Sequence, residues 1–432
     1  MTEKLLAYIF SNMADAMCIT AKNGEIHYTS KSAEKLFGFG ESSAGCKIWE
    51  VIPFTERNDK LIQLFIDAVK MQRDIHSFAD YENNAGKIFR LHISMSYMKG
   101  EGGIFVIIAT DLTEFLRINS AFERYTSPEI AKYVLRTPEG EKQGGKLKDV
   151  TILMSDLRGF TALSTKLSAD TLITILNHYF EKMIAVIERW KGTMIEFLGD
   201  GIFVVFGAPN DDENHADHAV SCAVEMQNAM KSVNEWNAEN NYPLLEMGIG
   251  INSGPAVVGN IGSAQKMKYG CIGETVNLAG RVETFTVGGQ IYISERTKEK
   301  ITENLFTSDE QSFMPKGAAS PMKIFAVDGI GDIHILHRDY VMKDVARKCE
   351  VKFSVIAGKI VDGEKYSGHV VKISDDERYA VIETDAKIEA MQNLLIDIGG
   401  SLYAKILSKD GEQVTVCFTS KPDCFGEWVK SL

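Results

Sequence analysis

Val150-Thr-Ile-Leu-Met-Ser-Asp-Leu-Arg-Gly-Phe-Thr161 is the stretch that decides the fold of the central part of the chain. The apolar run 150–154 is typical of a buried strand, and it delivers Asp156 at its end. The residues after Asp156 turn into a helix, whose first peptide N–H groups have no acceptor within the helix and favour a polyphosphate. The stretch therefore predicts a strand, a carboxylate and an anion-binding helix start in succession.

A second carboxylate is expected at the tip of a hairpin. Strand-type runs over residues 193–198 and 202–206 flank Gly199-Asp-Gly201. This pattern places Asp200 in the turn between two strands.

The remaining elements complete the order β-α-β-β-α-β. A helix capped by Ser168 separates the first two strands, and a second helix from Ala216 to about Trp236 follows the hairpin. A strand over residues 246–252 then ends at the turn Ser253-Gly-Pro255. This order predicts an α+β domain of ferredoxin-like type, in which a carboxylate ending the first strand can lie beside one at the hairpin tip.

Two close carboxylates have a limited set of chemical uses. They repel each other, and a shared proton or a divalent cation relieves the repulsion. With oxygen ligands alone the cation would be Mg²⁺ or Mn²⁺, with substrate phosphates completing its shell. Taken by themselves, Asp156 and Asp200 also fit ordinary turns, because Asp-Gly is a common turn sequence.

Five motifs that occur in order support the interpretation of Asp156 and Asp200 as metal ligands. They are Met154-Ser-Asp-Leu-Arg-Gly-Phe-Thr161, Glu196-Phe-Leu-Gly-Asp-Gly201, Gly250-Ile-Asn-Ser-Gly254, Val258-Gly-Asn-Ile-Gly262 and Gly273-Glu-Thr-Val-Asn-Leu-Ala-Gly-Arg-Val-Glu283. The set strongly resembles the catalytic domain of class III nucleotidyl cyclases, which we place at residues 149–328. The resemblance implies conversion of a nucleoside triphosphate into a 3′,5′-cyclic nucleotide and pyrophosphate, at sites formed between two catalytic domains of a homodimer.

The resemblance also implies the metal ligands. Asp156 and Asp200 match the family's two carboxylate ligands, and the Leu157 carbonyl is expected to assist them. Two ions, Mg²⁺ or Mn²⁺, are expected in each active site. One would lower the pKa of the ribose 3′-hydroxyl, and the other would hold the β- and γ-phosphates.

The resemblance implies the substrate contacts as well. Asn277 and Arg281, which share a helix face through their i, i+4 spacing, match the pair that orients the ribose and stabilises transition-state charge. The turn Gly159-Phe160-Thr161 is expected to bind phosphates. A family lysine for the terminal phosphates falls near Ala318, and Lys316 is the substitute that this sequence offers.

Two positions bear on the choice of purine. Adenine-specific members of the family carry Lys and either Asp or Thr where this chain has Glu196 and Gly270. A carboxylate accepts from both N1–H and N2–H₂ of guanine but faces the N1 acceptor of adenine unfavourably. We therefore predict a guanylate cyclase acting on GTP. The alternatives are an adenylyl cyclase that makes cyclic AMP from ATP, and a catalytically silent nucleotide-binding scaffold.

Residues 1–111 are predicted to form a small α+β sensor module. The motifs Asp15-Ala-Met-Cys-Ile-Thr20, Gly24-Glu-Ile26, Ser32-Ala-Glu-Lys-Leu-Phe-Gly38 and Ala109-Thr-Asp-Leu-Thr113 resemble a PAS domain. Its ligand is unknown, and a PAS domain used only for dimerisation and signal relay is the alternative.

Two further segments flank the catalytic region. Residues 112–148 are predicted to be a connector, with a helix whose apolar spacing suits a seam between two chains and a flexible linker over 137–145. Residues 340–432 contain six short strand patterns, which predict a small β-barrel. The barrel faintly resembles a PilZ domain but departs from its cyclic-dinucleotide binding motifs. A cyclic dinucleotide or a protein is its candidate partner.

Composition limits the class of partner and the location. The 432 residues carry 47 basic and 59 acidic side chains, a net charge of 47 − 59 = −12. Nucleic-acid binding by the whole chain is not expected, because that needs clustered cations. No membrane span and no signal peptide are predicted, and seven scattered cysteines are typical of reduced thiols. We predict a cytoplasmic protein.

Overall fold

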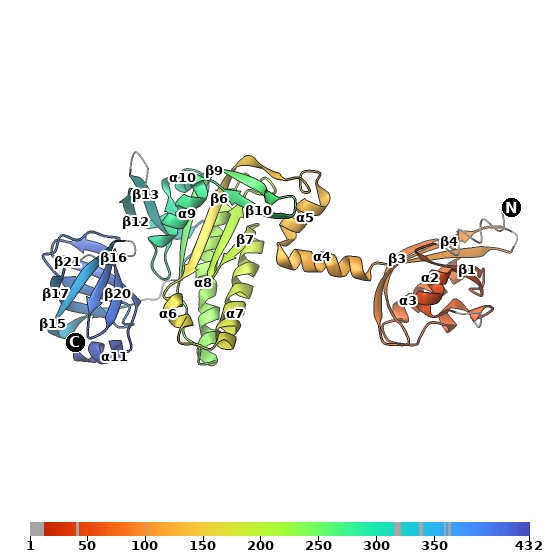
Figure 1. The fold of residues 1–432 in the computed structure, drawn as a ribbon, viewed down its shortest axis with the longest axis horizontal. Coiled ribbons are helices and arrows are strands. Elements are labelled where there is room, and N and C mark those ends of the chain that lie inside the picture. The colour runs from red at the N-terminus through yellow and green to blue at the C-terminus, as the bar shows by residue number, and fades with distance from the viewer. Residues whose placement is uncertain are drawn as a thin grey trace. The chain divides into compact units, whose positions relative to one another are not determined.

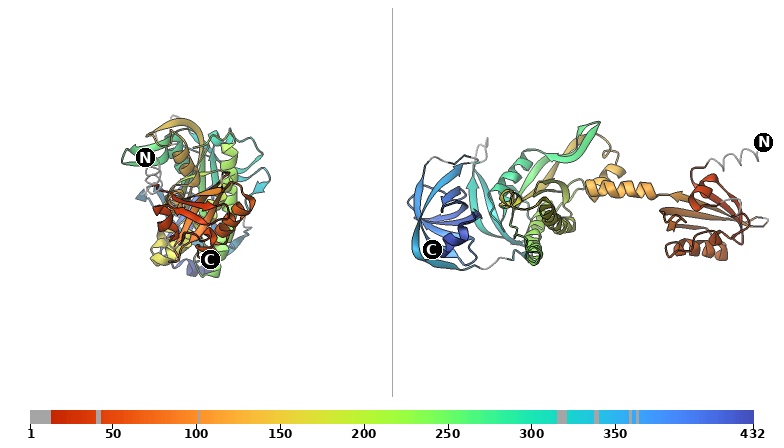
Figure 2. Two further views of the ribbon diagram at one scale, coloured as in Figure 1. Left: turned by 90° about the vertical axis from the view of Figure 1, so that its right-hand side faces the viewer. Right: turned by 60° about the horizontal axis from the view of Figure 1, so that its bottom comes forward.

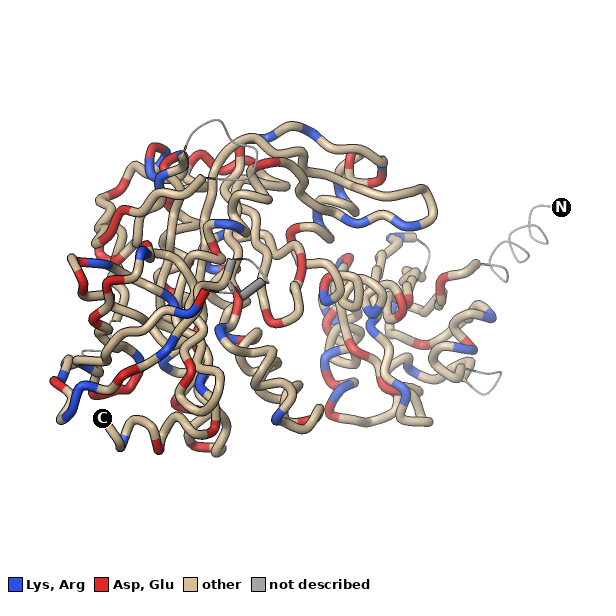
Figure 3. The backbone as a smooth tube through the Cα atoms, turned by 60° about the vertical axis from the view of Figure 1, so that its left-hand side comes forward, with Lys and Arg blue, Asp and Glu red and all other residues tan. Residues whose placement is uncertain are grey.

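The chain divides into two compact units, Met1–Tyr125 and Thr126–Leu432 (Figure 1). The structure is a computed structural model that describes residues 13–39, 43–100, 102–314, 321–336, 340–357, 360–361 and 364–432. Figure 3 shows Lys and Arg positions interspersed with Asp and Glu positions along the described chain. Across those residues, the structure holds no helix with both the length and the apolar character of a membrane span.

The first unit contains a five-stranded antiparallel sheet of order β2-β1-β5-β4-β3. The predicted helix near residue 30 forms, because the Ser30 side chain caps its start and Gly38 ends it in the left-handed conformation. Phe65, Tyr81 and Phe105 lie in a core between the sheet and the helices. The elements are β1 (Ala16–Ala21), β2 (Ile26–Thr29), α2 (Lys31–Phe37), η2 (Ile48–Glu50), α3 (Asp59–Met71), β3 (Ile75–Glu82), β4 (Ile88–Met98) and β5 (Ile104–Asp111).

The helix α4 (Thr113–Tyr125) ends the first unit. It is described in full, and none of its residues is buried. Phe115 is 60% exposed and Ile118 is 57% exposed, so the apolar side of the helix lies open within this unit. The seam between two chains stays a prediction for this surface.

The second unit is built on a sheet of order β12-β13-β11-β9-β6-β8-β7. The four strands β9-β6-β8-β7 are the ferredoxin-like core, so the predicted α+β fold is confirmed. Helices α7 and α8 lie side by side (Figures 1 and 2) and pack on one face of the sheet, whereas α5 and α9 contribute to a smaller apolar core. The elements are α5 (Pro128–Arg136), β6 (Gly144–Leu157), α6 (Phe160–Ser164), α7 (Ala169–Arg189), β7 (Thr193–Leu198), β8 (Gly201–Phe206), α8 (His215–Glu239), β9 (Met247–Ser263), β10 (Lys266–Ile272), α9 (Glu274–Thr284), β11 (Ile291–Ser294), α10 (Glu295–Lys298), β12 (Leu305–Phe313), β13 (Met322–Ile330) and β14 (Ile333–His334).

Two strands are longer than the sequence predicted. Residues 144–148, at the end of the predicted linker and connector, are the first part of β6. Ser253-Gly-Pro255, predicted as a turn, lies inside β9. The reason is their mutual pairing, which runs from Gly144 opposite Asn260 to Leu157 opposite Met247 and supplies backbone partners along both strands.

The C-terminal part of the second unit is a closed barrel of six main strands, as predicted. Pairing of β15 (Met342–Ala357) with β19 (Asn393–Asp397) closes the sheet and removes its edges. The elements are β15 (Met342–Ala357), β16 (Ile360–Val361), β17 (Tyr366–Ser374), β18 (Tyr379–Glu383), β19 (Asn393–Asp397), β20 (Ser401–Asp410), β21 (Gln413–Ser420) and α11 (Phe425–Ser431).

Candidate active site

The two predicted metal-binding aspartates lie together at one end of the sheet. Asp156 is near the end of β6, and Asp200 is at the tip of the β7–β8 hairpin. The Leu157 N–H donates to Asp200 Oδ2 over 3.2 Å, which ties the tip to the strand end. A Cβ at Gly201 would lie 2.7 Å from the Ser155 carbonyl oxygen, so glycine permits this close approach. The structure therefore places Asp156, Leu157 and Asp200 in one site.

The side chains of this site carry more negative than positive charge. Burial, together with the negative charges of Asp200 and Glu283, raises the pKa of Asp156 to about 7. The Arg158 guanidinium, 3.8 Å from the Asp156 carboxylate, offsets part of this effect. A hydrogen bond to Asp200 also favours the protonated Asp156 carboxyl. Either a proton or a cation is therefore needed to hold the two carboxylates together at neutral pH.

The donor set fits a hard divalent cation. Asp156 and Asp200 offer carboxylate oxygens and Leu157 offers a carbonyl oxygen, the ligands that Mg²⁺ and Mn²⁺ prefer. In the part of the chain that the structure describes, no group of three or more His, Cys, Asp and Glu side chains is placed to hold a metal ion. Two carboxylates alone leave most of the coordination shell to water and substrate oxygens, as is usual for Mg²⁺ bound with phosphates.

The ion pair of Arg158 with Glu283, next to the aspartates, was not predicted from the sequence. Arg158 Nη2 donates to the Glu283 carbonyl oxygen over 3.2 Å, to the Glu283 carboxylate and to Thr286 Oγ1 over 2.7 Å. Burial raises the pKa of Glu283, and Arg158 opposes that rise. Both residues lie inside the quoted motifs, but only the tertiary structure shows that they join the end of β6 to the end of α9.

The helix α9 presents Asn277 and Arg281 away from the core. It packs closely on the sheet because Gly250 has no side chain: a Cβ there would lie 2.1 Å from the Glu283 nitrogen. Asn277 is exposed and Arg281 is half-buried. Within the described ranges, neither side chain has a hydrogen bond or an ion pair, and the structure does not join them to the aspartates of their own chain. Both side chains are therefore free to contact a ligand or a second chain.

The expected phosphate-binding turn opens a very short helix. Gly159 has φ +70° and precedes α6, which has only five residues. Phe160 is buried and Thr161 is exposed. A helix this short adds little macrodipole, so its contribution to an anion would come from the unpaired N–H groups of the first turn. Lys316, the predicted contact for the terminal phosphates, lies outside the described residues.

The two positions predicted to contact the base lie on neighbouring strands. Glu196 follows a β-bulge in β7, where the register shifts between Met194 and Glu196. A bulge re-aims the side chain that follows it. Glu196 Oε2 lies 2.5 Å from Lys268 Nζ, and Lys268 is two residues before Gly270 on β10. Lys268 was not singled out from the sequence. It lies two residues from Gly270, and residues two apart in a strand lie on the same face of the sheet.

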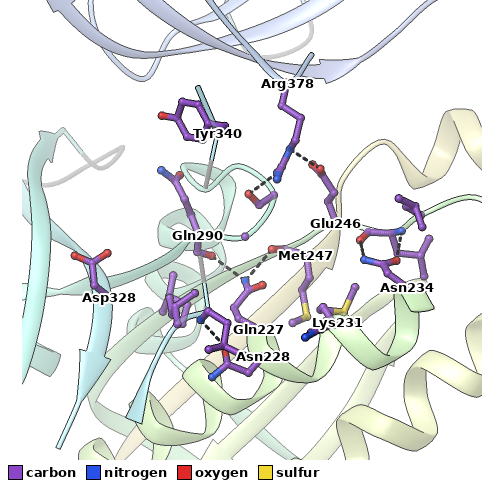
Figure 4. Close-up of a pocket in the computed structure, with 18 of the residues that line it drawn as sticks. Gln227, Asn228, Lys231, Asn234, Glu246, Met247, Gln290, Asp328, Tyr340 and Arg378 are labelled. Carbon is purple, nitrogen blue, oxygen red and sulfur yellow. Dashed lines mark hydrogen bonds and ion pairs between the residues drawn. The ribbon is translucent and has the colours of Figure 1, made fainter. Parts of the chain in front are cut away.

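The barrel contacts the catalytic part of the second unit at the end of α9 and at the residue before β9. Lys405 Nζ donates to the Thr284 carbonyl oxygen over 2.7 Å, and the Arg378 guanidinium lies 2.8 Å from Glu246 Oε1. Figure 4 shows Arg378 joined to Glu246 at the edge of a cleft of about 920 Å³, whose lining also includes Tyr340 and Gln290. The residues lining this cleft include none of the predicted site residues.

The buried lysine gives a prediction for pH-dependent stability. Burial, with the Arg158 charge as a second cause, lowers the pKa of Lys405 to about 7. Between this pKa and the higher one in the unfolded chain, only the unfolded state binds the proton, so the free energy of unfolding rises with pH from 7 to about 10. Lys405→Met removes this rise. The melting temperature of the variant minus that of wild type should therefore be larger at pH 6.5 than at pH 9.5.

The matched control for this prediction is Lys352→Met, because Lys352 is an exposed lysine of the same barrel. Its melting temperature should follow that of wild type at both pH values. A difference between wild type and Lys405→Met that does not change with pH would contradict the prediction.

Comparison with known proteins gives two family matches. Residues 143–329 match the adenylate and guanylate cyclase catalytic domain, and residues 14–114 match a PAS domain. Adenylate cyclase 1 of Rhizobium meliloti is 27% identical over 186 residues, which are 41% of this chain and 28% of that protein. The chain covers less than a third of the first curated relatives that it matches.

Solved structures of both specificities are similar to this chain. The guanylyl cyclase Cya2 is 45% identical, over 45% of this chain and 100% of that one, with a TM-score of 0.44. The adenylyl cyclase CyaB from P. aeruginosa is 36% identical, over 42% of this chain and 95% of that one, with a TM-score of 0.41.

Proposed function

Residues 143–329 place this chain in the adenylate and guanylate cyclase family, behind a PAS domain, and from that premise we propose that it converts GTP into 3′,5′-cyclic GMP and pyrophosphate. The observation that carries the proposal is the juxtaposition of Asp156 and Asp200, tied by the Leu157 N–H. The two carboxylates supply the negative charge that holds a divalent cation, and the cation in turn attracts a triphosphate.

The residues divide the work of the reaction. Asp156 and Asp200, with the Leu157 carbonyl, would hold two divalent cations, which supply Lewis acidity toward the 3′-hydroxyl and the phosphates when bound. The N–H groups at the start of α6 bind phosphate oxygens. Asn277 positions the ribose, and Arg281 stabilises the charge that develops on the α-phosphate as the 3′-oxygen attacks and pyrophosphate leaves. Two chains are needed, because the side chains of α9 serve the aspartates of the partner.

The choice of GTP rests on Glu196. Its carboxylate accepts from N1–H and N2–H₂ of guanine, whereas adenine would present an acceptor to it. A mispaired polar group of this kind costs about 1–3 kcal/mol, which corresponds to tenfold discrimination or more. The proposal is tested by supplying GTP and ATP separately with Mn²⁺ to the purified chain and identifying the product by chromatography. Cyclic GMP as the main product supports it, and cyclic AMP alone contradicts it.

Glu196→Lys should shift the preference toward ATP. The ammonium would donate to N1 of adenine and repel the N1–H of guanine, so we expect the ratio of kcat/KM for GTP to that for ATP to fall at least about tenfold. The control is Glu188→Lys, which makes the same charge change on an exposed position of α7. An equal fall in both activities, or a ratio that matches the control, would speak against base contact by Glu196.

A further inference from the structure

One outward-facing lysine of the barrel is buried against the catalytic part of the second unit. On β20, Leu402, Ala404 and Ile406 belong to the apolar core of the barrel. Side chains alternate along a strand, so Lys405 points out of the barrel between the last two. It is nonetheless only 3% exposed, and its Nζ donates to the Thr284 carbonyl oxygen over 2.7 Å. The catalytic part therefore covers this side chain.

Neighbouring strands extend the covered face of the barrel. Cys417 of β21 pairs with Lys405 on one side and with Tyr379 of β18 on the other. Like Lys405 it is buried, at 1% exposure. Two residues further along β21, the Thr419 carbonyl oxygen would lie 3.2 Å from a Cβ at Gly159. The face of the barrel thus extends from the end of α9 to the turn before α6, which is the turn expected to bind phosphates.

The hydrogen bond from Lys405 holds the end of the helix that carries Arg281. Thr284 is the last residue of α9, and the last carbonyl groups of a helix have no partner within it. An ammonium group there satisfies one carbonyl and suits the negative end of the helix dipole. Thr284 Oγ1 in turn donates to the Arg281 carbonyl oxygen over 2.7 Å. Two successive hydrogen bonds therefore link the backbone of Arg281 to the barrel.

The same end of α9 is joined to the metal site of its own chain. Glu283, the residue before Thr284, accepts hydrogen bonds from Arg158 through its carbonyl oxygen and its carboxylate. Arg158 Nη1 lies 3.8 Å from Asp156 Oδ2. A displacement of this helix end would therefore disturb the groups around Asp156 as well as the position of Arg281.

We propose that Lys405 is a positioning residue for the cyclisation, and that it holds the end of α9 so that Arg281 reaches the α-phosphate in the site of the partner. The barrel then serves the catalytic site directly. This inference rests on the proposed function and adds a residue from outside the cyclase domain to the same reaction. Because Arg281 acts on charge that develops in the transition state, its misplacement lowers kcat more than it changes KM.

Steady-state turnover of GTP with Mn²⁺ by Lys405→Met tests the proposal. Methionine fills the buried space but donates no hydrogen bond to Thr284, so we expect kcat to fall about tenfold with little change in KM. Lys405→Arg keeps a donor and should retain most of the turnover. Amide hydrogen exchange, followed by mass spectrometry, should become faster in Lys405→Met over residues 278–286 and stay unchanged in the barrel.

Lys409→Met is the matched control, because Lys409 lies on the same strand and donates to the Ala386 and Ile388 carbonyl oxygens within the barrel. It should leave kcat and the exchange of α9 unchanged. An unchanged kcat in Lys405→Met, or an equal fall in Lys409→Met, would overturn the proposal. Faster exchange throughout the barrel of Lys405→Met would give the lysine a merely structural role and also overturn it.

Failure of the proposed function would look different. In that case the unaltered chain forms no cyclic product from either triphosphate, whatever residue stands at position 405. The exchange rates of α9 in wild type, Lys405→Met and Lys409→Met then decide whether Lys405 holds the end of this helix. Equal rates in all three chains would overturn the positioning role on their own.

Discussion

Asp156→Asn should abolish cyclic-nucleotide formation and, in the absence of metal, raise the stability of the protein above pH 7. The activity is lost because an amide is a poor ligand for a hard cation, and the electrostatic stabilisation it helps to provide is worth several kcal/mol, or about 10³-fold in rate. The stability is gained because the variant has no second negative charge to place beside Asp200. A purely structural role for Asp156 would give the reverse, a loss of stability.

The sign of the stability change follows from the raised pKa. The folded state holds the proton of Asp156 up to pH 7, whereas the unfolded state releases it near pH 4. The free energy of unfolding therefore falls as pH rises between these values, and the penalty is fully present above pH 7. Because the Asp156 side chain is 43% exposed, solvent screening limits the penalty to the order of 1 kcal/mol.

Melting curves in a chelator at pH 5 and pH 8 measure this effect. The variant should melt above wild type at pH 8, with a much smaller difference at pH 5. Asp332→Asn, at an exposed aspartate in the turn before β14, is the control and should change neither turnover nor the pH dependence. A variant that keeps its turnover, or a melting difference that is the same at both pH values, would refute the assignment of Asp156.

Two inactive variants should together restore activity. Asp156→Asn removes a metal ligand from the site of its own chain. Arg281→Ala removes the arginine that its chain contributes to the site of the partner. A heterodimer of the two contains one complete site, so it should turn over GTP at about half the wild-type rate per dimer. Co-expression with two different tags, followed by purification on both, isolates this heterodimer. Each homodimer should be inactive.

The double variant provides the converse measurement. A heterodimer of wild type with Asp156→Asn/Arg281→Ala has one defect in each site if α9 serves the partner, and it should be inactive. If α9 instead served its own chain, this heterodimer would keep half the activity and the mixture of single variants would have none. The two arrangements therefore give opposite results, and loss of folding affects both heterodimers alike.

Local patterns predicted most of the elements of this chain, and the failures have physical causes. The helix after Ser30 and the helix after Ser168 begin where a side chain caps them, a signal contained in a few residues. Ser253-Gly-Pro255 has the composition of a turn, yet it continues as a strand because β6 supplies its backbone partners. Such pairing joins residues about a hundred positions apart, so no local window contains it.

The candidate site divides in the same way. The order of motifs along the chain was sufficient to select both aspartates, Asn277, Arg281 and Glu196, because each lies in a recognisable local context. The side chains that accompany them, Arg158 with Glu283 and Lys268 with Glu196, became evident only in three dimensions.

What the amino-acid order determined by itself was the kind of domain and the identity of its charged groups, since periodicity, caps and motif spacing are properties of neighbouring residues. What only the tertiary structure decided was which charges meet. The end of β6, the tip of a hairpin and the end of α9 converge through sheet pairing, and the field at Asp156 is the sum over groups from all three. Electrostatic interaction depends on distance and burial in space, and neither can be read from separation along the chain.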